Sequence, residues 1–178
     1  MTDIADNVGL LCVVDALGVT QLHDVVYMIC CQSSGRHWLS TISKFNSTSR
    51  HRLTDIVVND FRSPRDIVAC ERTSRVYVAD EGCIWLLSSD GTHTSWLPQS
   101  LTDTLMPWTL SVTSTRLLVT SYNTRQLIQF DADGDELRRV QLPDDMVPRH
   151  AVQSPTGTSS VTSTYNCTAT IHNCIRVT

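Results

Sequence analysis

The chain has 178 residues, of which 41% are hydrophobic and 18% are charged, and its formal net charge is −4. This composition supports the folded core of one domain and argues against an intrinsically disordered chain. The negative charge gives no general attraction to a polyanion, so we expect no DNA partner and no binding to a membrane surface.

The first residues are acidic, at Asp3 and Asp6, where a secretory signal is basic. No segment approaches the roughly 20 apolar residues that a membrane-spanning helix requires. We therefore expect a cytoplasmic protein. The cysteines agree with this, because their number is odd and because Cys12, Cys30 and Cys70 stand in apolar runs. These features favour buried thiols over a disulfide framework.

Residues 10–61 carry the least regular strand pattern. A first strand is expected within Gly9–Thr20, and three more follow at 24–29, 41–45 and 52–58. The stretch Gln32–Leu39 is expected to be a protruding loop, and its Arg36 and Trp38 are candidates for a contact surface. A variable hairpin tip without a role is the alternative.

Residues 62–105 contain the clearest pattern. Pro64 opens an apolar run, and three further runs alternate or stay apolar as strands do. Asp90-Gly91 predicts a hairpin with a type I′ turn, in which Gly supplies the positive φ without strain. The four expected strands are Pro64–Ala69, Arg75–Asp80, Ile84–Leu87 and Thr92–Leu97.

Residues 106–146 repeat this order, with Pro107 at the start and Asp133-Gly134 between the third and fourth strands. The expected strands here are Pro107–Val112, Arg116–Ser121, Leu127–Phe130 and Glu136–Leu142. Pro148 opens a further copy, but the Ser- and Thr-rich sequence after Pro155 gives no clear strand pair. Residues 147–178 are therefore expected to be a remnant.

The prolines recur about every 40 residues, and each full unit holds four short strands, which is typical of β-propeller blades. We therefore predict an all-β fold: an incomplete β-propeller of four-stranded antiparallel blades, with about three blades and a remnant, in a single partial propeller domain that spans 1–178. A β-sandwich is the alternative. The expected blades are 10–61, 62–105 and 106–146, followed by the remnant 147–178.

A closed six-bladed ring at this period needs on the order of 250 residues. We therefore expect a fragment of a longer protein, with completion by a second chain as the alternative. The two open flanks predict self-association, aggregation or marginal stability, because each carries apolar side chains and unpaired strand edges.

The two clearest units resemble NHL repeats of six-bladed propellers, over roughly Val19–Val152. The matching segments are Pro64, Val76-Tyr77-Val78-Ala79-Asp80 and Asp90-Gly91 in one unit, and Pro107, Leu117-Leu118-Val119-Thr120 and Asp131-Ala132-Asp133-Gly134 in the next. The Asn-His dipeptide that often follows the second strand of such repeats is replaced by Glu81-Gly82 and by Tyr122-Asn123-Thr124. The resemblance implies a module that binds protein, or RNA, on one rim.

No motif of the common catalytic classes is present: there is no Gly-x-Ser-x-Gly, phosphate-binding loop, His-Glu-x-x-His or Cys-x-x-Cys. Propellers of this kind include calcium-dependent hydrolases and lactonases, but Asp66 alone cannot supply the six to eight oxygens of a calcium site. Cys167, His172 and Cys174 match no zinc pattern. We expect no enzyme, metal or cofactor; the alternative is a fragment of such a hydrolase, lactonase or lyase whose catalytic residues lie outside this chain.

The residues after the three opening prolines form a candidate site, because such positions start the innermost strands near one rim of a propeller. Guanidiniums and an indole there suit an anionic or aromatic partner. The alternative is that Arg65 pairs with Asp66 or another local carboxylate and that Trp108 packs between blades. The expected partner is a protein, with RNA as the second candidate. The candidate rim residues are Arg65, Trp108, Arg149 and His150, together with Arg36 and Trp38.

Overall fold

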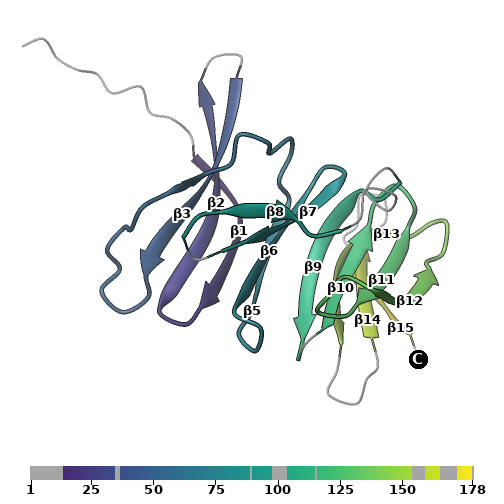
Figure 1. Cartoon of the computed structure of the whole chain (residues 1–178). Helices are drawn as coiled ribbons and strands as arrows, with labels where there is room; N and C mark the ends of the chain where they lie inside the picture. The colour runs from purple at the N-terminus through teal and green to yellow at the C-terminus, as the bar shows by residue number, and fades with distance from the viewer. Residues whose placement is uncertain are drawn as a thin grey trace, which may run out of the picture.

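The computed structural model describes residues 14–34, 37–88, 90–97, 104–114, 116–153, 159–164 and 172–177. These residues form 15 strands, which build four antiparallel sheets side by side (Figure 1). Within this described part there is no helix that is long and apolar enough to cross a membrane.

Each sheet is formed by consecutive strands in sequence order. The first sheet contains β1 (Val14–Leu22), β2 (Val25–Ser34), β3 (His37–Asn46) and β4 (Ile56–Val57). The second contains β5 (Asp66–Cys70), β6 (Arg75–Asp80), β7 (Cys83–Leu87) and β8 (His93–Ser95). The third contains β9 (Pro107–Thr113), β10 (Arg116–Ser121), β11 (Gln126–Phe130) and β12 (Glu136–Gln141). The fourth contains β13 (Val147–Gln153), β14 (Ser159–Thr164) and β15 (His172–Val177).

The core lies between the sheets, and the second sheet contributes to it with both faces. Val76 and Val78 of β6 pack against the first sheet, whereas Tyr77 and Ala79 belong to the cluster shared with the third sheet. Side chains alternate along a strand, so a strand that is buried on both sides becomes continuously apolar. The predicted strands that contain Val76, Val78, Leu117 and Val119 are confirmed: these four residues are buried, and their strands run antiparallel to the strands that follow the prolines.

The innermost strand of each sheet lies beside that of the next: β1 beside β5, β5 beside β9, and β9 beside β13. One side chain joins each neighbouring pair. Thr20 Oγ1 accepts a hydrogen bond from the Ala69 N–H at 3.0 Å, and Asp66 Oδ2 accepts one from the Leu110 N–H at 2.8 Å. Ser111 Oγ donates to the Ala151 carbonyl. The architecture is an incomplete β-propeller, as predicted.

Two expectations about individual strands are wrong. Gln32–Leu39 is not a loop, since β2 and β3 remain paired up to Ser34 and His37 and extend as a long hairpin at the upper end of the first sheet in Figure 1. Backbone pairing joins the two strands along this extension, and the alternation of side chains does not reveal it. The sequence after Pro155 does contain a strand pair, β14 and β15. Thr and Val, which are β-branched, favour strands even where polar residues dominate.

The two Asp-Gly sequences occupy equivalent connections, β7 to β8 and β11 to β12, as predicted. Gly91 and Gly134 have φ of 92° and 95°. Asp90 and Asp133 do not have positive φ, so the predicted type I′ geometry is wrong. At the first turn the Gly91 N–H donates to the Ser88 carbonyl at 3.0 Å. This is the pattern of a tight turn that ends in a left-handed glycine.

Candidate partner-binding rim

The second strand of each sheet returns to the end at which the innermost strand begins. The segments that lead into β5, β9 and β13 and the turns after β6 and β10 therefore lie at one end, the upper end in Figure 1. We call this end the upper rim. It is made of residues 62–65, 80–83, 104–108, 121–125 and 147–150.

Three side chains from two neighbouring sheets form a stack on the upper rim. The Arg65 guanidinium carbon lies 4.7 Å from the centroid of the Trp108 ring. The Trp108 and Tyr122 rings follow at a centroid distance of 5.0 Å and an interplanar angle of 31°. Arg65 is exposed, Trp108 is half-buried, and Tyr122 is 45% exposed. The stack thus places a cation on an aromatic pair at the surface, where a partner can reach it.

Arg65 does not pair with Asp66, so the alternative interpretation of that residue is wrong. The Asp66 carboxylate instead accepts the backbone N–H of Leu110 at 2.8 Å and that of Ile67 at 2.9 Å. Burial raises the pKa of Asp66, whereas these two N–H groups and the nearby His150 lower it. Arg65 makes no ion pair with any carboxylate in the described part of the chain.

Asn123 fixes the turn that carries Tyr122. Its Oδ1 accepts the Met106 N–H at 3.1 Å, and its Nδ2 donates to the Thr104 carbonyl at 2.8 Å. The Tyr122 N–H donates to the Met106 carbonyl at 3.0 Å. These bonds tie the turn after β10 to the segment that enters β9, so Tyr122 and Trp108 are held in a fixed relation.

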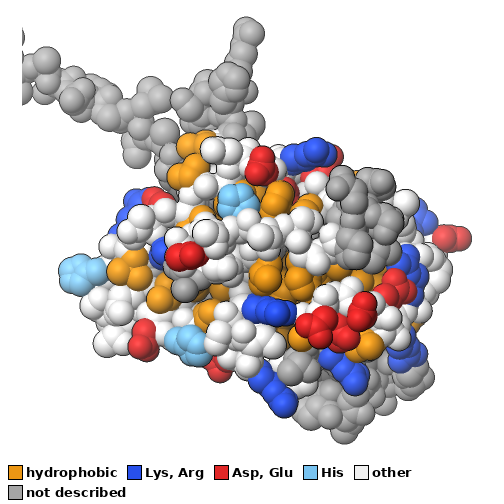
Figure 2. Space-filling model, viewed as in Figure 1, with side chains coloured by type: hydrophobic (Ala, Val, Ile, Leu, Met, Phe, Trp, Pro, Cys, Tyr) orange, Lys and Arg blue, Asp and Glu red, His pale blue; other side chains and the backbone are white. Residues whose placement is uncertain are grey.

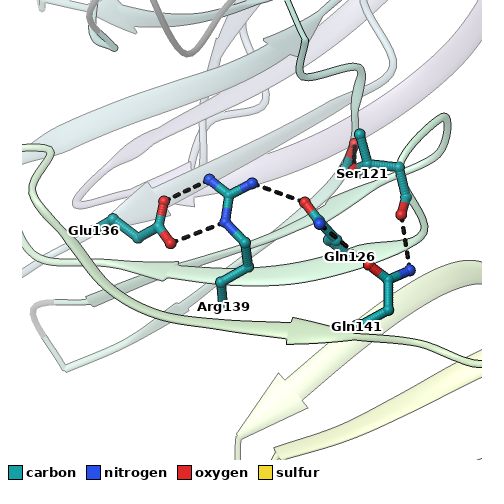
Figure 3. Close-up of polar contacts among 6 residues, drawn as sticks. Ser121, Gln126, Glu136, Arg139 and Gln141 are labelled. Carbon is teal, nitrogen blue, oxygen red and sulfur yellow. Dashed lines mark hydrogen bonds and ion pairs between the residues drawn. The ribbon is translucent and has the colours of Figure 1, made fainter.

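A row of polar side chains on β11 and β12 braces the same turn (Figure 3). Gln141 Nε2 donates to the Thr124 carbonyl at 3.0 Å and Gln126 Nε2 donates to Gln141 Oε1 at 3.1 Å. Arg139 Nη1 donates to Gln126 Oε1 at 2.8 Å, and its other nitrogens bind Glu136. The hydrogen bond from Arg139 lowers the pKa of Glu136. The row therefore runs from the Arg139–Glu136 ion pair to the backbone carbonyl of Thr124, in the turn that carries Tyr122.

Asp80 has the corresponding role in the second sheet. Its carboxylate accepts the N–H groups of Arg62 and Ser63, at 3.0 and 2.6 Å, and the Trp85 indole N–H at 3.1 Å. The side chain is only 1% exposed. Asp80 thus fixes the segment that enters β5, and with it the position of Arg65.

Two hollows lie near the stack. One, of about 740 Å³, adjoins it through Met106 and is also lined by Arg62, Trp85 and Leu105. The other, of about 370 Å³, follows the innermost strands, and Asp66 and His150 lie on its wall. Both fall within the size range of ligand pockets.

The structure brings together only part of the predicted site. Arg65 and Trp108 meet, and His150 is exposed on β13. Arg149 also lies in β13, and Trp38 in β3, but their side chains are outside the described residues, as is the whole of Arg36. Tyr122 was missed, because turn residues follow no strand period. The available signal was its position directly after β10, which corresponds to Glu81 after β6.

Among the described side chains, no three from His, Cys, Asp and Glu lie close enough to hold a metal ion. The side chains of Cys167, His172 and Cys174 lie outside the described residues. Cys30 and Cys70 are buried free thiols, as expected, and Cys12 is not described. Figure 2 shows acidic and basic side chains interspersed over the third sheet, at the right of the view, without a large area of one sign.

No protein-family model and no curated protein matches the chain. Solved structures do match. A chain of a nidogen/laminin complex is 16% identical with a TM-score of 0.68, over 90% of this chain and 60% of that one. A streptogramin B lyase is 12% identical with a TM-score of 0.58, over 91% of this chain and 68% of that one. A Bacteroides caccae protein of unknown function is 13% identical with a TM-score of 0.55, over 92% of this chain and 61% of that one.

These identities are low, so the likeness shows the fold alone. Propellers occur in the nidogen/laminin complex and in the lyase, which agrees with the four sheets described above. This chain spans about 60% of the length of the nidogen/laminin chain. The fold shown by the strands and by the comparisons together is that of a β-propeller.

Proposed function

We propose that this chain is a non-enzymatic propeller module that binds a protein partner at the upper rim. The observation that carries the proposal is the stack of Arg65, Trp108 and Tyr122. These three residue types supply most of the binding energy in protein interfaces when they are held rigidly and become desolvated. Here the backbone N–H groups of Arg65 and Tyr122 donate to the Ala79 and Met106 carbonyls, and the hollow beside Met106 offers room for a partner's side chain.

Two comparisons support this proposal without deciding it. The sequence resembles NHL repeats, whose propellers present one rim to a partner. A structure of similar fold is that of a protein complex, nidogen with laminin. RNA is the less favoured partner, since the chain's net charge of −4 opposes the approach of a polyanion.

A propeller lyase or hydrolase is the second candidate. It is favoured by the hollow that Asp66 and His150 line, and by the similar fold of a streptogramin B lyase. Both polar atoms of the Asp66 carboxylate already accept backbone N–H groups, however, so this carboxylate is engaged in holding β5 to β9. We therefore favour the binding module.

The test is a parallel selection of displayed random peptides and of random RNA on the immobilised chain. We expect peptides to be enriched, and Trp108→Ala to weaken their binding at least tenfold, because it removes the centre of the stack. Leu137→Ala is the matched control, since Leu137 is exposed on β12 away from the rim. Equal loss in both variants, or enrichment of RNA alone, would contradict the proposal.

A further inference from the structure

We infer that the upper rim recognises an Asp or Glu side chain of its protein partner, whose carboxylate is received by the Arg65 guanidinium. The inference rests on the proposed function and names the chemistry of its partner. The Arg65 guanidinium carbon lies over the Trp108 ring, 4.7 Å from the ring centroid. A guanidinium directs its N–H donors outward in its own plane, so stacking leaves them available to a ligand.

Among the described residues, these donors have no carboxylate partner. The nearest acidic residue in sequence, Asp66, is engaged by the N–H groups of Leu110 and Ile67. Asp80 is buried and accepts three other donors. Glu81 is exposed but forms no ion pair with Arg65 or with Arg62 within the described part of the chain.

The charge near the stack also favours an anionic ligand. Arg62, three residues before Arg65, is exposed, and its side chain makes no hydrogen bond or ion pair with a described residue. Within the described part of the chain, neither of these two cationic side chains at the segment that enters β5 has a carboxylate partner. An exposed pair of like charges gains most from an anionic partner, because each guanidinium can form a charge-assisted hydrogen bond.

Geometry distinguishes a carboxylate from a phosphate as the ligand of Arg65. A stacked guanidinium matches a planar carboxylate through two parallel hydrogen bonds. Helix N-termini are a common phosphate site, and the described rim contains no helix. The Trp108 and Tyr122 rings also give the methylene groups of a Glu or Asp side chain an apolar surface to contact.

The probes that test this are blocked amino acids. N-acetyl-glutamate N-methylamide carries the carboxylate, N-acetyl-glutamine N-methylamide is its neutral isostere, and inorganic phosphate represents the competing anion. Titrations are followed by NMR at the Arg65 Nε–H and the Trp108 indole N–H. We expect saturable shifts with the glutamate compound and at least tenfold weaker binding of the glutamine compound. Equal affinity for the two, tighter binding of phosphate, or absence of binding would overturn the inference.

Variants separate this inference from the proposed function. Arg65→Gln is expected to abolish the preference for glutamate, and Arg65→Lys to weaken it, since lysine keeps the charge but loses the planar fork. Arg72→Gln is the matched control, because Arg72 is an exposed arginine in the turn between β5 and β6 at the opposite end. If selected peptides bind the parent chain, lose affinity in Trp108→Ala and keep it in Arg65→Gln, the inference fails and the proposed function stands. If Trp108→Ala has no effect on them either, both fail.

Discussion

At the scale of single residues, the shape of the rim depends on side-chain acceptors. Asp80 and Asn123 hold the segments that enter β5 and β9, one with a carboxylate and the other with an amide. A carboxylate forms stronger hydrogen bonds than an amide, but a buried carboxylate must be fully satisfied to be tolerated. Asp80 meets this condition with three donors. Its loss leaves those donors without a partner.

Asp80→Ala is expected to lower the free energy of unfolding by about 2–4 kcal/mol, because the N–H groups of Arg62 and Ser63 and the Trp85 indole become unsatisfied. Asp80→Asn keeps an oxygen acceptor and should lower the free energy of unfolding by less. Urea denaturation measures the free energy of unfolding of both variants. Asp133→Ala is the control, as an exposed residue of a turn, and should change stability by less than about 0.5 kcal/mol. A similar small effect in Asp80→Ala would refute the role given to this carboxylate.

Asp66 provides a pH-dependent prediction. Burial raises its pKa in the folded chain, with the Leu110 and Ile67 N–H groups and His150 acting in the opposite direction. The protonated carboxyl therefore favours the folded state. That contribution is complete below the ordinary Asp pKa of about 4 and is lost as the pH rises through the higher folded value.

The stability of the parent chain relative to Asp66→Asn should therefore decrease as the pH is raised from the acidic range to neutrality. Comparing the two chains at each pH cancels the titration of other groups. Urea denaturation at a series of pH values gives the difference. A difference that is constant, or that increases with pH, would show that burial does not dominate at Asp66.

At the scale of elements, the turn between the first and second strands repeats an unfavourable backbone conformation. His23, Ser74 and Ser114 have φ of 51°, 50° and 49°, and each lies just before β2, β6 or β10. Non-glycine residues disfavour this left-handed region by roughly 1–2 kcal/mol. The repeat shows that blade geometry, and not local preference, determines these turns.

Ser114→Gly is therefore expected to raise the free energy of unfolding by about 0.5–1 kcal/mol, since glycine adopts positive φ without strain but loses more entropy on folding. Thr94→Gly, at an exposed position of β8, has no strain to relieve and should destabilise by about 0.5–1 kcal/mol. Thermal unfolding of both variants provides the comparison. Destabilisation in Ser114→Gly would mean that the serine conformation is not strained.

The sequence predicted elements where apolar periodicity decides them and failed where it does not. The strands around Val78 and Val119 follow from short apolar runs, and the Asp-Gly turns follow from glycine's tolerance of positive φ. The extension of β2 and β3 was not predictable, because its polar residues are joined through the backbone. For the candidate site, the position after each proline identified Arg65 and Trp108. Tyr122 required the three-dimensional register of the turn, which no periodicity encodes.

At the scale of the whole molecule, the four sheets form an open row in which the first and fourth lie at opposite ends (Figure 1). The inner face of the first sheet presents Ile29, Ile42 and Ile56 to the second. Successive side chains of a strand point to opposite faces, so their neighbours in sequence face outward. Val19 and Val57 on that outer face are 64% and 53% exposed, whereas Cys30, Thr41 and Ser43 on the same face are buried. In a propeller such a face is normally covered by another blade.

We expect this outer face to drive self-association of the chain, because exposed apolar sheet faces rarely remain uncovered in monomeric proteins. Sedimentation velocity over a range of concentrations should show species larger than the monomer. The double variant Val19→Lys with Val57→Lys should shift the distribution toward monomer, since two like charges oppose stacking of this face. Both positions are exposed, so the double variant should remain folded. An unfolding temperature close to that of the parent chain would verify this.

Leu137→Lys is the matched control, because Leu137 is exposed to a similar extent on β12 of the third sheet. It adds a charge on a different surface and should leave the distribution unchanged if the first sheet is the contact. A parent chain that stays monomeric at every concentration would contradict the prediction. If Leu137→Lys dissociates the oligomers to the same extent, the added charge alone accounts for the effect. The outer face of the first sheet would then not be the contact.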